Sequence, residues 1–103
     1  DKKSIYLIAE MDSKLVGYAY GSYKKDVNIY FQTSIRGKAN ALVVDKKFRG
    51  KGIARALTAE RQKWFKSKKC EYVFLTVFAT NPAVEFHKKQ GYKPYVLEMG
   101  KKL

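Results

Sequence analysis

The stretch best suited to chemistry is the run at positions 49–54, whose sequence is Arg-Gly-Lys-Gly-Ile-Ala. Its glycines, Gly50 and Gly52, leave the backbone open to close approach by a ligand. The run lies between a short apolar strand pattern and a helical pattern. The first amide groups of such a helix have no partner within it and carry partial positive charge. A strand, a glycine turn and a helix start therefore predict a cradle for a phosphate group.

Positive charge is concentrated around this run. The chain has 22 basic and nine acidic residues, a formal net charge of +13, and residues 46–69 hold ten of the basic residues but a single acid, Glu60. Clustered charge attracts phosphates, and Arg49, Lys51 and Arg55 are nearest to the glycines in sequence. A solvated, lysine-rich helix face explains the same excess. The spacing matches neither a P-loop nor the Gly-x-Gly-x-x-Gly dinucleotide fingerprint.

The hydrophobic pattern predicts the elements that position this run. Strands are predicted at residues 5–10, 15–23, 41–44, 72–78 and 92–99, with helices at 53–69 and 82–90; residues 24–38 are ambiguous between strand and loop. Asn81 and Pro82 are typical of a helix start, and Gly91 of a helix end. The order is β-β-(β)-β-α-β-α-β, which indicates one α+β domain over residues 1–103, a mixed sheet covered by helices.

Length and composition exclude several classes of protein. With 103 residues, 46% apolar and 30% charged, the chain has the composition of a folded domain with room for one core. It has neither an apolar run of the roughly 20 residues that cross a bilayer nor a signal-peptide pattern, so we expect a cytoplasmic protein and no membrane partner. Cys70 is the only cysteine. This excludes an internal disulfide and a multi-cysteine metal site, and we expect no metal.

Two segments resemble the signatures of the GNAT superfamily of acetyl-CoA-dependent N-acetyltransferases. Residues 49–54 fit its Arg/Gln-x-x-Gly-x-Gly/Ala signature, and residues 42–48 look like the strand that leads into it. Residues 81–92 are similar to the second signature, in which Asn, Ala, a hydroxyl-bearing aromatic residue and Gly-Phe/Tyr follow one another. The two segments occur in the order of the family, and the resemblance covers residues 5–103.

The resemblance implies a particular fold. GNAT domains have a central, mostly antiparallel sheet in which one pair of parallel strands splays apart, and the wedge holds the pantetheine arm of coenzyme A. The first strand and two helices that usually build the acceptor side are missing from residues 1–103. We therefore expect a cosubstrate-binding core without its acceptor half, or one completed by another chain. A second copy could cover the exposed edge strand in a homodimer.

The resemblance also implies a reaction, the direct transfer of an acetyl group from acetyl-CoA to a primary amine of a small molecule or peptide, without a covalent enzyme intermediate. The partners are then acetyl-CoA and an amine acceptor. The implied cosubstrate-binding residues are Leu42, Val43 and Val44 along the wedge, Arg49, Gly50, Lys51, Gly52, Ile53, Ala54 and Arg55 around the pyrophosphate, and Asn81 at the pantetheine or the reaction intermediate.

The sequence departs from the family at the position of the general acid. His87 stands where many members have the tyrosine that protonates the departing thiolate, and an imidazole can donate or accept a proton near neutral pH. An exposed helix histidine beside Lys88 and Lys89 is the plainer interpretation. Asn81 lies ten residues before Gly91, one fewer than is usual in the family.

The sequence offers more than one candidate for the general base. Some members carry a carboxylate on the strand that leads into the glycine turn, but residues 40–44 have none. Glu10 and Asp45 are the nearest candidates by segment. Glu10 is equally well explained as a solvent-facing hairpin residue, and Asp45 as a cap that ends a strand. Deprotonation of the amine through ordered water is also compatible with the family.

Two other functions stay open. The charge cluster is compatible with a module that binds nucleic acid or the ribosome, although no nucleic-acid-binding motif accompanies it. His87 and the short N-terminal part are compatible with a domain that binds coenzyme A without catalysis. We take the N-acetyltransferase as the leading hypothesis.

Overall fold

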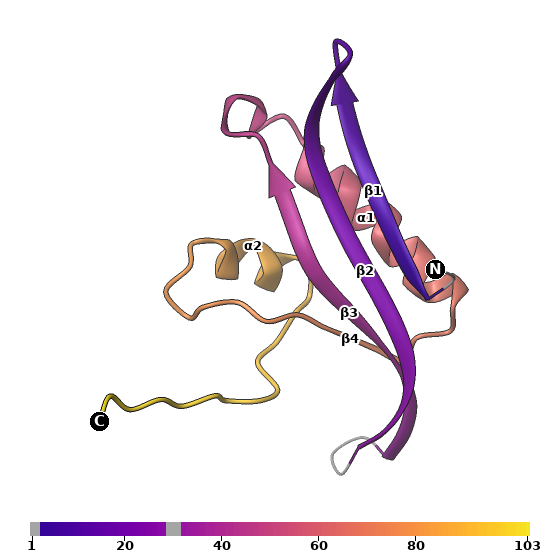
Figure 1. The fold of residues 1–103 in the computed structure, drawn as a ribbon, viewed down its shortest axis with the longest axis vertical. Helices are drawn as coiled ribbons and strands as arrows, with labels where there is room; N and C mark the ends of the chain where they lie inside the picture. The colour runs from indigo at the N-terminus through magenta and orange to yellow at the C-terminus, as the bar shows by residue number, and fades with distance from the viewer. Residues whose placement is uncertain (1–2, 29–31) are drawn as a thin grey trace.

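A computed structural model describes residues 3–28 and 32–103 (Figure 1). In chain order the elements are β1 (Ser4–Met11), β2 (Lys14–Asn28), β3 (Gln32–Val44), the short 3-10 helix η1 (Lys46–Phe48), α1 (Ile53–Ser67), β4 (Tyr72–Phe74) and α2 (Ala83–Lys89). The strands form one sheet in the order β1-β2-β3-β4. The pairs β1/β2 and β2/β3 are antiparallel, whereas β3/β4 is parallel. The prediction of a mixed α+β sheet is confirmed.

The first two strands form the predicted hairpin. Asp12 and Ser13 make the turn with φ angles of 50° and 63°, in the left-handed region that two-residue hairpin turns require. β2 continues well beyond residue 23 and pairs with β3, for example through Lys24 and Arg36. The ambiguous segment 24–38 is therefore strand wherever it is described, and residues 29–31 lie outside the described residues.

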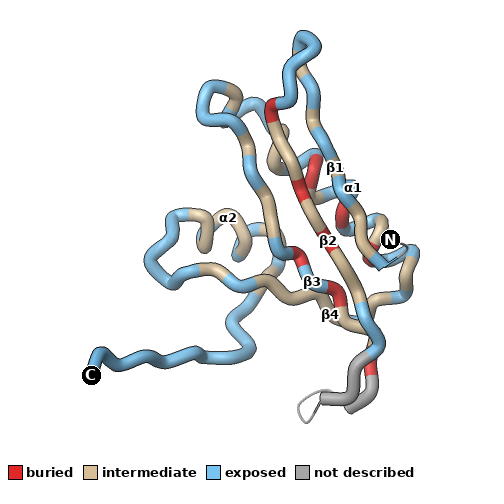
Figure 2. The backbone as a smooth tube through the Cα atoms, in the orientation of Figure 1, coloured by how far each residue is buried: buried red, intermediate tan, exposed pale blue. Residues whose placement is uncertain are grey.

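Helix α1 packs against one face of the sheet, and glycines allow it to come close. A Cβ atom at Gly17 would lie 3.0 Å from Ile53 Cγ2, and one at Gly37 would lie 2.7 Å from the ring of Phe65. The buried apolar residues all belong to β2, β3 and α1 (Figure 2). They are Val16, Ala19, Ala39, Leu57 and Phe65. α1 begins at Ile53, as predicted.

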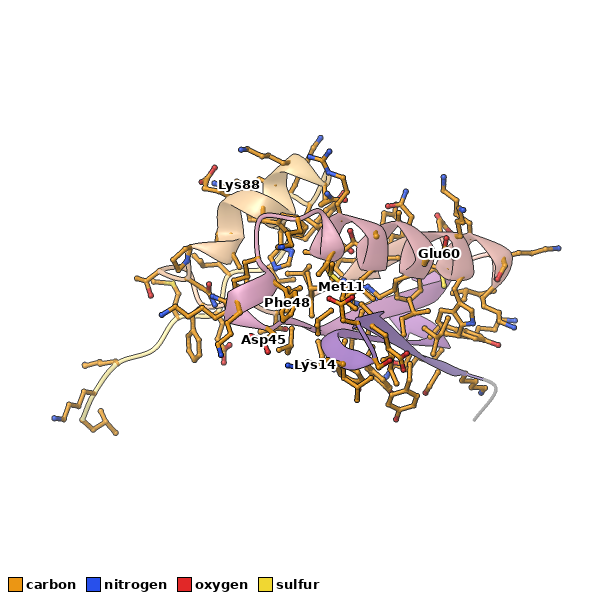
Figure 3. All side chains as sticks on the ribbon, turned by 90° about the horizontal axis from the view of Figure 1, so that it is seen from above. Met11, Lys14, Asp45, Phe48, Glu60 and Lys88 are labelled. Carbon is orange, nitrogen blue, oxygen red and sulfur yellow. The ribbon has the colours of Figure 1, made fainter. Side chains whose placement is uncertain are left out.

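Helix α2 lies on the same side of the sheet as α1 (Figure 3). The Asn81 side chain accepts a hydrogen bond from the Ala83 amide at 2.9 Å, and Gly91 follows the helix with a φ of 98°. The helix predicted at 82–90 forms over Ala83–Lys89, with Pro82 rather than Asn81 as its N-cap residue, and the predicted stop at Gly91 is confirmed. Within the described residues, neither helix is long and apolar enough to cross a membrane.

Two strand predictions are wrong: one strand is shorter than predicted, and the other does not form. The strand predicted at 72–78 pairs with β3 only over Tyr72–Phe74. The strand predicted at 92–99 does not form, and the segment extends from the body with Leu97 80% exposed (Figures 1 and 2). A strand needs a hydrogen-bonded neighbour, whatever the β propensity of its residues. Here the contacts of the segment with β4 include the ring of Tyr95, which packs against the Phe74 ring at 5.7 Å between centroids.

Replacing Gly37 with alanine is expected to lower the free energy of unfolding by about 1–3 kcal/mol, the usual effect of overpacking. The new methyl group would approach the Phe65 ring to 2.7 Å, and Phe65 is buried against the sheet. Denaturant unfolding followed by circular dichroism measures the change. Gly100→Ala is the matched control, because no atom lies within 4 Å of a Cβ there. Equal stability of the two variants would contradict the close packing of α1.

Candidate active site

The glycine turn leaves the start of α1 open. Gly50 and Gly52 have φ angles of 79° and 83°, a conformation that favours glycine. Gly52 is the N-cap residue of α1, and no side chain caps the helix there. The amides at 53–55 thus have no partner within the helix. A Cβ at either glycine would have no described atom within 4 Å apart from its chain neighbours, so the backbone is accessible to a ligand.

Three cations surround this turn. The Arg49 side chain donates a hydrogen bond from Nε to the Val44 carbonyl at 3.1 Å, which ties the turn to the end of β3. Lys51 Nζ lies 5.8 Å from the centroid of the Phe48 ring. Arg55 is exposed in the first turn of α1. The accessible amides therefore lie in a positively charged environment, which suits an anionic group.

The parallel strands β3 and β4 separate well before β3 reaches this turn. They pair from Arg36–Tyr72 to Lys38–Phe74 and no further. β3 continues to Val44 with β2 on one side, whereas the chain leaves the sheet after Phe74 (Figure 1). Along residues 39–44 the other edge of β3 thus faces no strand in the described structure. The splayed parallel pair implied by the resemblance is present.

A cavity of about 210 Å³ lies where the two strands separate. One wall comes from β3, a second from the segment after β4, and the rest from α1, α2 and the residue that caps α2. The lining residues are Ala39, Asn40, Leu42, Arg61, Leu75, Thr76, Val77, Asn81, Ala83, Phe86 and His87. The cavity therefore combines apolar walls with amide, hydroxyl, imidazole and guanidinium groups.

His87 is half-buried in this cavity, with its ring centroid 6.0 Å from that of Tyr92. Burial lowers the pKa of His87 below 6.5, and the positive charge of Arg61 lowers it further. Burial raises the pKa of Tyr92, while Arg61 acts in the opposite direction. At neutral pH the imidazole is therefore mostly uncharged. His87 is not the fully exposed helix residue of the plainer interpretation.

Arg61 is a buried cation among the cavity residues for which the sequence predicted no role. It is 3% exposed, and its Nη1 donates hydrogen bonds to the carbonyls of Tyr20 at 3.0 Å and Ala41 at 2.8 Å. Burial lowers its pKa, partly offset by Tyr92. The sequence held a signal, because Arg61 lies midway between Leu57 and Phe65 on the apolar stripe of α1. A cation on that stripe is buried with it.

The structure brings together three of the predicted site residues and separates the others. Leu42, Asn81 and His87 line the one cavity, whereas Val43 is 58% exposed and the glycine turn lies beyond the end of β3. The side-chain oxygen of Asn81 accepts a hydrogen bond from the Ala83 amide at the start of α2, just before the N-cap residue Pro82.

The two carboxylates considered as general bases, Asp45 and Glu10, lie where their structural interpretations place them, as a cap residue and a solvent-facing residue. Asp45 Oδ1 accepts a hydrogen bond from the Lys47 amide at 3.0 Å, which makes it the N-cap residue of η1 directly after β3. Glu10 is exposed on β1, in the first hairpin. No cluster of three histidine, cysteine or acidic residues that could hold a metal ion occurs among the residues described.

Comparisons with known proteins agree with this geometry. The model of the acetyltransferase (GNAT) family matches residues 1–92. An acetyltransferase of Pectobacterium atrosepticum is 34% identical over 80 residues, which are 78% of this chain and 50% of that protein. The chain thus spans half the length of this curated relative. The chain belongs to the GNAT acetyltransferase family.

Solved structures show the same fold. A putative acetyltransferase from Pyrococcus furiosus is similar with a TM-score of 0.86 and 28% identity, over 97% of this chain and 66% of that one. An aminoglycoside N-acetyltransferase solved in complex with CoA gives a TM-score of 0.80 at 23% identity, over 98% of this chain and 78% of that one. At this identity the second likeness shows the fold alone.

The pKa of His87 can be measured without assignment, because it is the only histidine in the chain. We expect its NMR titration in the folded protein to have a midpoint below 6.5, since burial and Arg61 disfavour the imidazolium. The unfolded chain then binds the proton more readily, so this residue makes the protein less stable as pH falls below about 6.5. The same protein in urea is the control. A folded midpoint at or above the urea value would contradict burial beside a cation.

Proposed function

We propose that this chain binds acetyl-CoA and transfers its acetyl group to a primary amine. The observation that carries the proposal is the separation of β3 from β4, which leaves an unpaired strand edge running from the glycine turn to the cavity. A thioester at the end of a long arm fits this arrangement, because the arm can occupy the place of the missing strand. Membership of the GNAT family supports the same reaction.

The two ends of the cosubstrate would be held differently. The amides from Gly50 to Arg55, with Lys51, Gly52, Ile53 and Ala54 between them, would bind the diphosphate beside Arg49. The backbone of β3 at Leu42, Val43 and Val44 would bind the amide groups of the pantetheine arm. Asn81 would contact the arm or the reacting carbonyl from the start of α2. The thioester would then lie in the cavity.

The reaction is a direct transfer without a covalent enzyme intermediate, so the main task of the protein is to position the amine and the thioester. A neutral amine attacks the thioester carbonyl, the carbon–nitrogen bond forms, and the electron pair of the carbon–sulfur bond leaves with the sulfur. Holding the two reactants together lowers the entropic part of the barrier. Hydrogen-bond donors at the carbonyl oxygen lower the electrostatic part. The proton of the attacking nitrogen leaves through solvent or a base.

His87 is proposed as the group that protonates the departing sulfur. Its place in the cavity supports this role, and its lowered pKa makes the imidazolium a stronger acid than an exposed one. The same shift makes the imidazolium the minor form at neutral pH. The contribution of His87 should therefore be largest at acidic pH and decline as pH rises through its pKa.

Binding is tested first by calorimetry with acetyl-CoA and, separately, with a duplex oligonucleotide, each at two salt concentrations. Acetyl-CoA binding without oligonucleotide binding supports the proposal. Salt-sensitive binding of the oligonucleotide alone would favour a nucleic-acid-binding module instead. A thiol-release assay over a panel of amines then separates an enzyme from a domain that only binds the cosubstrate.

Gly52→Val is expected to abolish measurable acetyl-CoA binding while the domain stays folded. An L residue in the left-handed conformation is disfavoured by roughly 1–2 kcal/mol, and a branched side chain would also fill the space beside the amides. Calorimetry measures the affinity and circular dichroism the fold. Gly100→Val serves as the control, because Gly100 lies in open space in the C-terminal segment. An unaltered affinity of Gly52→Val would exclude the glycine turn as the binding site.

His87→Phe is expected to lower turnover by about tenfold or more, toward the lower end of general acid catalysis, with little change in acetyl-CoA affinity. The aromatic ring keeps the contacts to the cavity and removes the titratable nitrogens. Thiol release at pH 6 and pH 8 measures turnover, and the deficit should be larger at pH 6. An unchanged rate at both pH values would mean that His87 has no part in proton transfer.

A further inference from the structure

Arg61 is a buried cation in the cavity to which the proposed function gives no task. We propose that Arg61 is a catalytic residue that stabilises the thiolate of coenzyme A as the carbon–sulfur bond breaks. This inference rests on the proposed function, because it requires the thioester to lie in the cavity between β3 and β4.

Contacts with β2 and β3 fix the position of the Arg61 side chain. Its stem passes Gly21, where a Cβ would lie 3.3 Å from both Cγ and Cδ of Arg61. Nη1 then bonds to the carbonyls of Tyr20 and Ala41. Between these partners and the next pair, Ser22 and Lys38, the register of β2 with β3 shifts. The guanidinium is thus held at the point of the sheet that borders the cavity.

The rest of the guanidinium has no acceptor among the residues described. An arginine has five N–H donors, and the two on Nη1 satisfy two carbonyls. The described hydrogen bonds of Arg61 are those two, so the donors on Nε and Nη2 are left for a ligand. Arg61 lines the cavity, where a ligand can reach it.

The charge of Arg61 is also without a carboxylate partner in the described part of the chain. The nearby acids on the two helices pair elsewhere, Glu60 with Lys63 at 3.2 Å and Glu85 with Lys88 at 3.7 Å. The titratable groups that interact electrostatically with Arg61 are His87 and Tyr92, both mostly uncharged at neutral pH. A buried cation without a counterion is unfavourable until an anion arrives.

The reaction produces that anion. When the amine has attacked, the electron pair of the carbon–sulfur bond passes to sulfur, which becomes a thiolate unless it is protonated at once. His87 is mostly neutral and supplies few protons at pH 7. Arg61 instead supplies a fixed, buried charge and unused donors, so stabilising the thiolate needs no rearrangement of the site. The thiolate can then take its proton from water after release.

The test measures the thiol of bound coenzyme A rather than turnover. Stabilisation of the thiolate lowers the pKa of the bound thiol below its free value of roughly 8.5, so affinity must rise with pH. S-methyl-CoA, which has the same phosphates and no thiol, is the reference ligand. For the unmodified protein we expect affinity for coenzyme A to increase about tenfold relative to S-methyl-CoA between pH 6.5 and 9.5, for a shift of one pKa unit.

Arg61→Met should remove this rise and lower kcat by about 100-fold, the usual effect of losing a preorganised donor, while affinity for S-methyl-CoA changes little. Arg61→Lys keeps the charge and should retain part of the rise. Lys66→Met, an exposed cation on the same helix, is the matched control and should retain all of it.

The outcomes separate the inference from the function on which it rests. If neither acetyl-CoA nor coenzyme A binds, the proposed function fails. If both bind but coenzyme A and S-methyl-CoA respond equally to pH in the unmodified protein, the role of Arg61 is excluded and the proposed function stands. That comparison needs no variant, so it decides the matter even if Arg61→Met does not fold. A rise that persists in folded Arg61→Met would also exclude Arg61 as its source.

Discussion

The site depends on one break in hydrogen bonding, the end of β3–β4 pairing at Lys38 and Phe74. Backbone groups along an unpaired strand edge need other partners, and an open edge tends to recruit another strand. Two arginines bond to carbonyls in this part of β3. Arg61 reaches Ala41 from the helix, and Arg49 reaches Val44 from the turn. Arg61 thus bridges β2 and β3 where their register shifts, and Arg49 ties the turn to the end of β3, so both side chains hold β3 in place beside the opening.

Helix α1 connects the two ends of this opening. Its uncapped start lies at the glycine turn, and Arg61 lies nine residues beyond Gly52, a distance of about 13 Å along the axis. Glycines at positions 17, 21 and 37 allow the helix to pack close to the sheet. This packing fixes the start and the buried middle of the helix relative to β3. A single helix thus carries the proposed anion site at its start and the buried cation in its middle. Positions set by one helix vary less than positions set by separate loops.

Local signals in the sequence were sufficient for the parts of the site that form locally. The turn glycines, the start of α1, and the cap and end of α2 at Asn81 and Gly91 each depend on a few neighbouring residues. The ends of strands, in contrast, do not depend on neighbouring residues alone. Residues 75–78 and 92–99 have strand-like composition, but whether they pair depends on a neighbour that no local pattern specifies. The burial of Arg61 is indicated by its place on the apolar stripe between Leu57 and Phe65, but its carbonyl partners are set by the sheet that the helix meets.

The charges of the chain differ in what they can do. The exposed cations around the glycine turn act through water, where salt screens them within about 8–10 Å, so they favour encounter with an anion more than they stabilise one. Arg61 is 3% exposed and lines the cavity, so water and salt screen its charge less than they screen the exposed cations. One buried guanidinium can therefore matter more to bond breaking than the whole surface excess of a chain whose net charge is +13. The carbonyls of Tyr20 and Ala41 offset part of the cost of burying Arg61, because they accept hydrogen bonds from its Nη1. The same two bonds, rather than a counterion, fix the orientation of the remaining N–H donors.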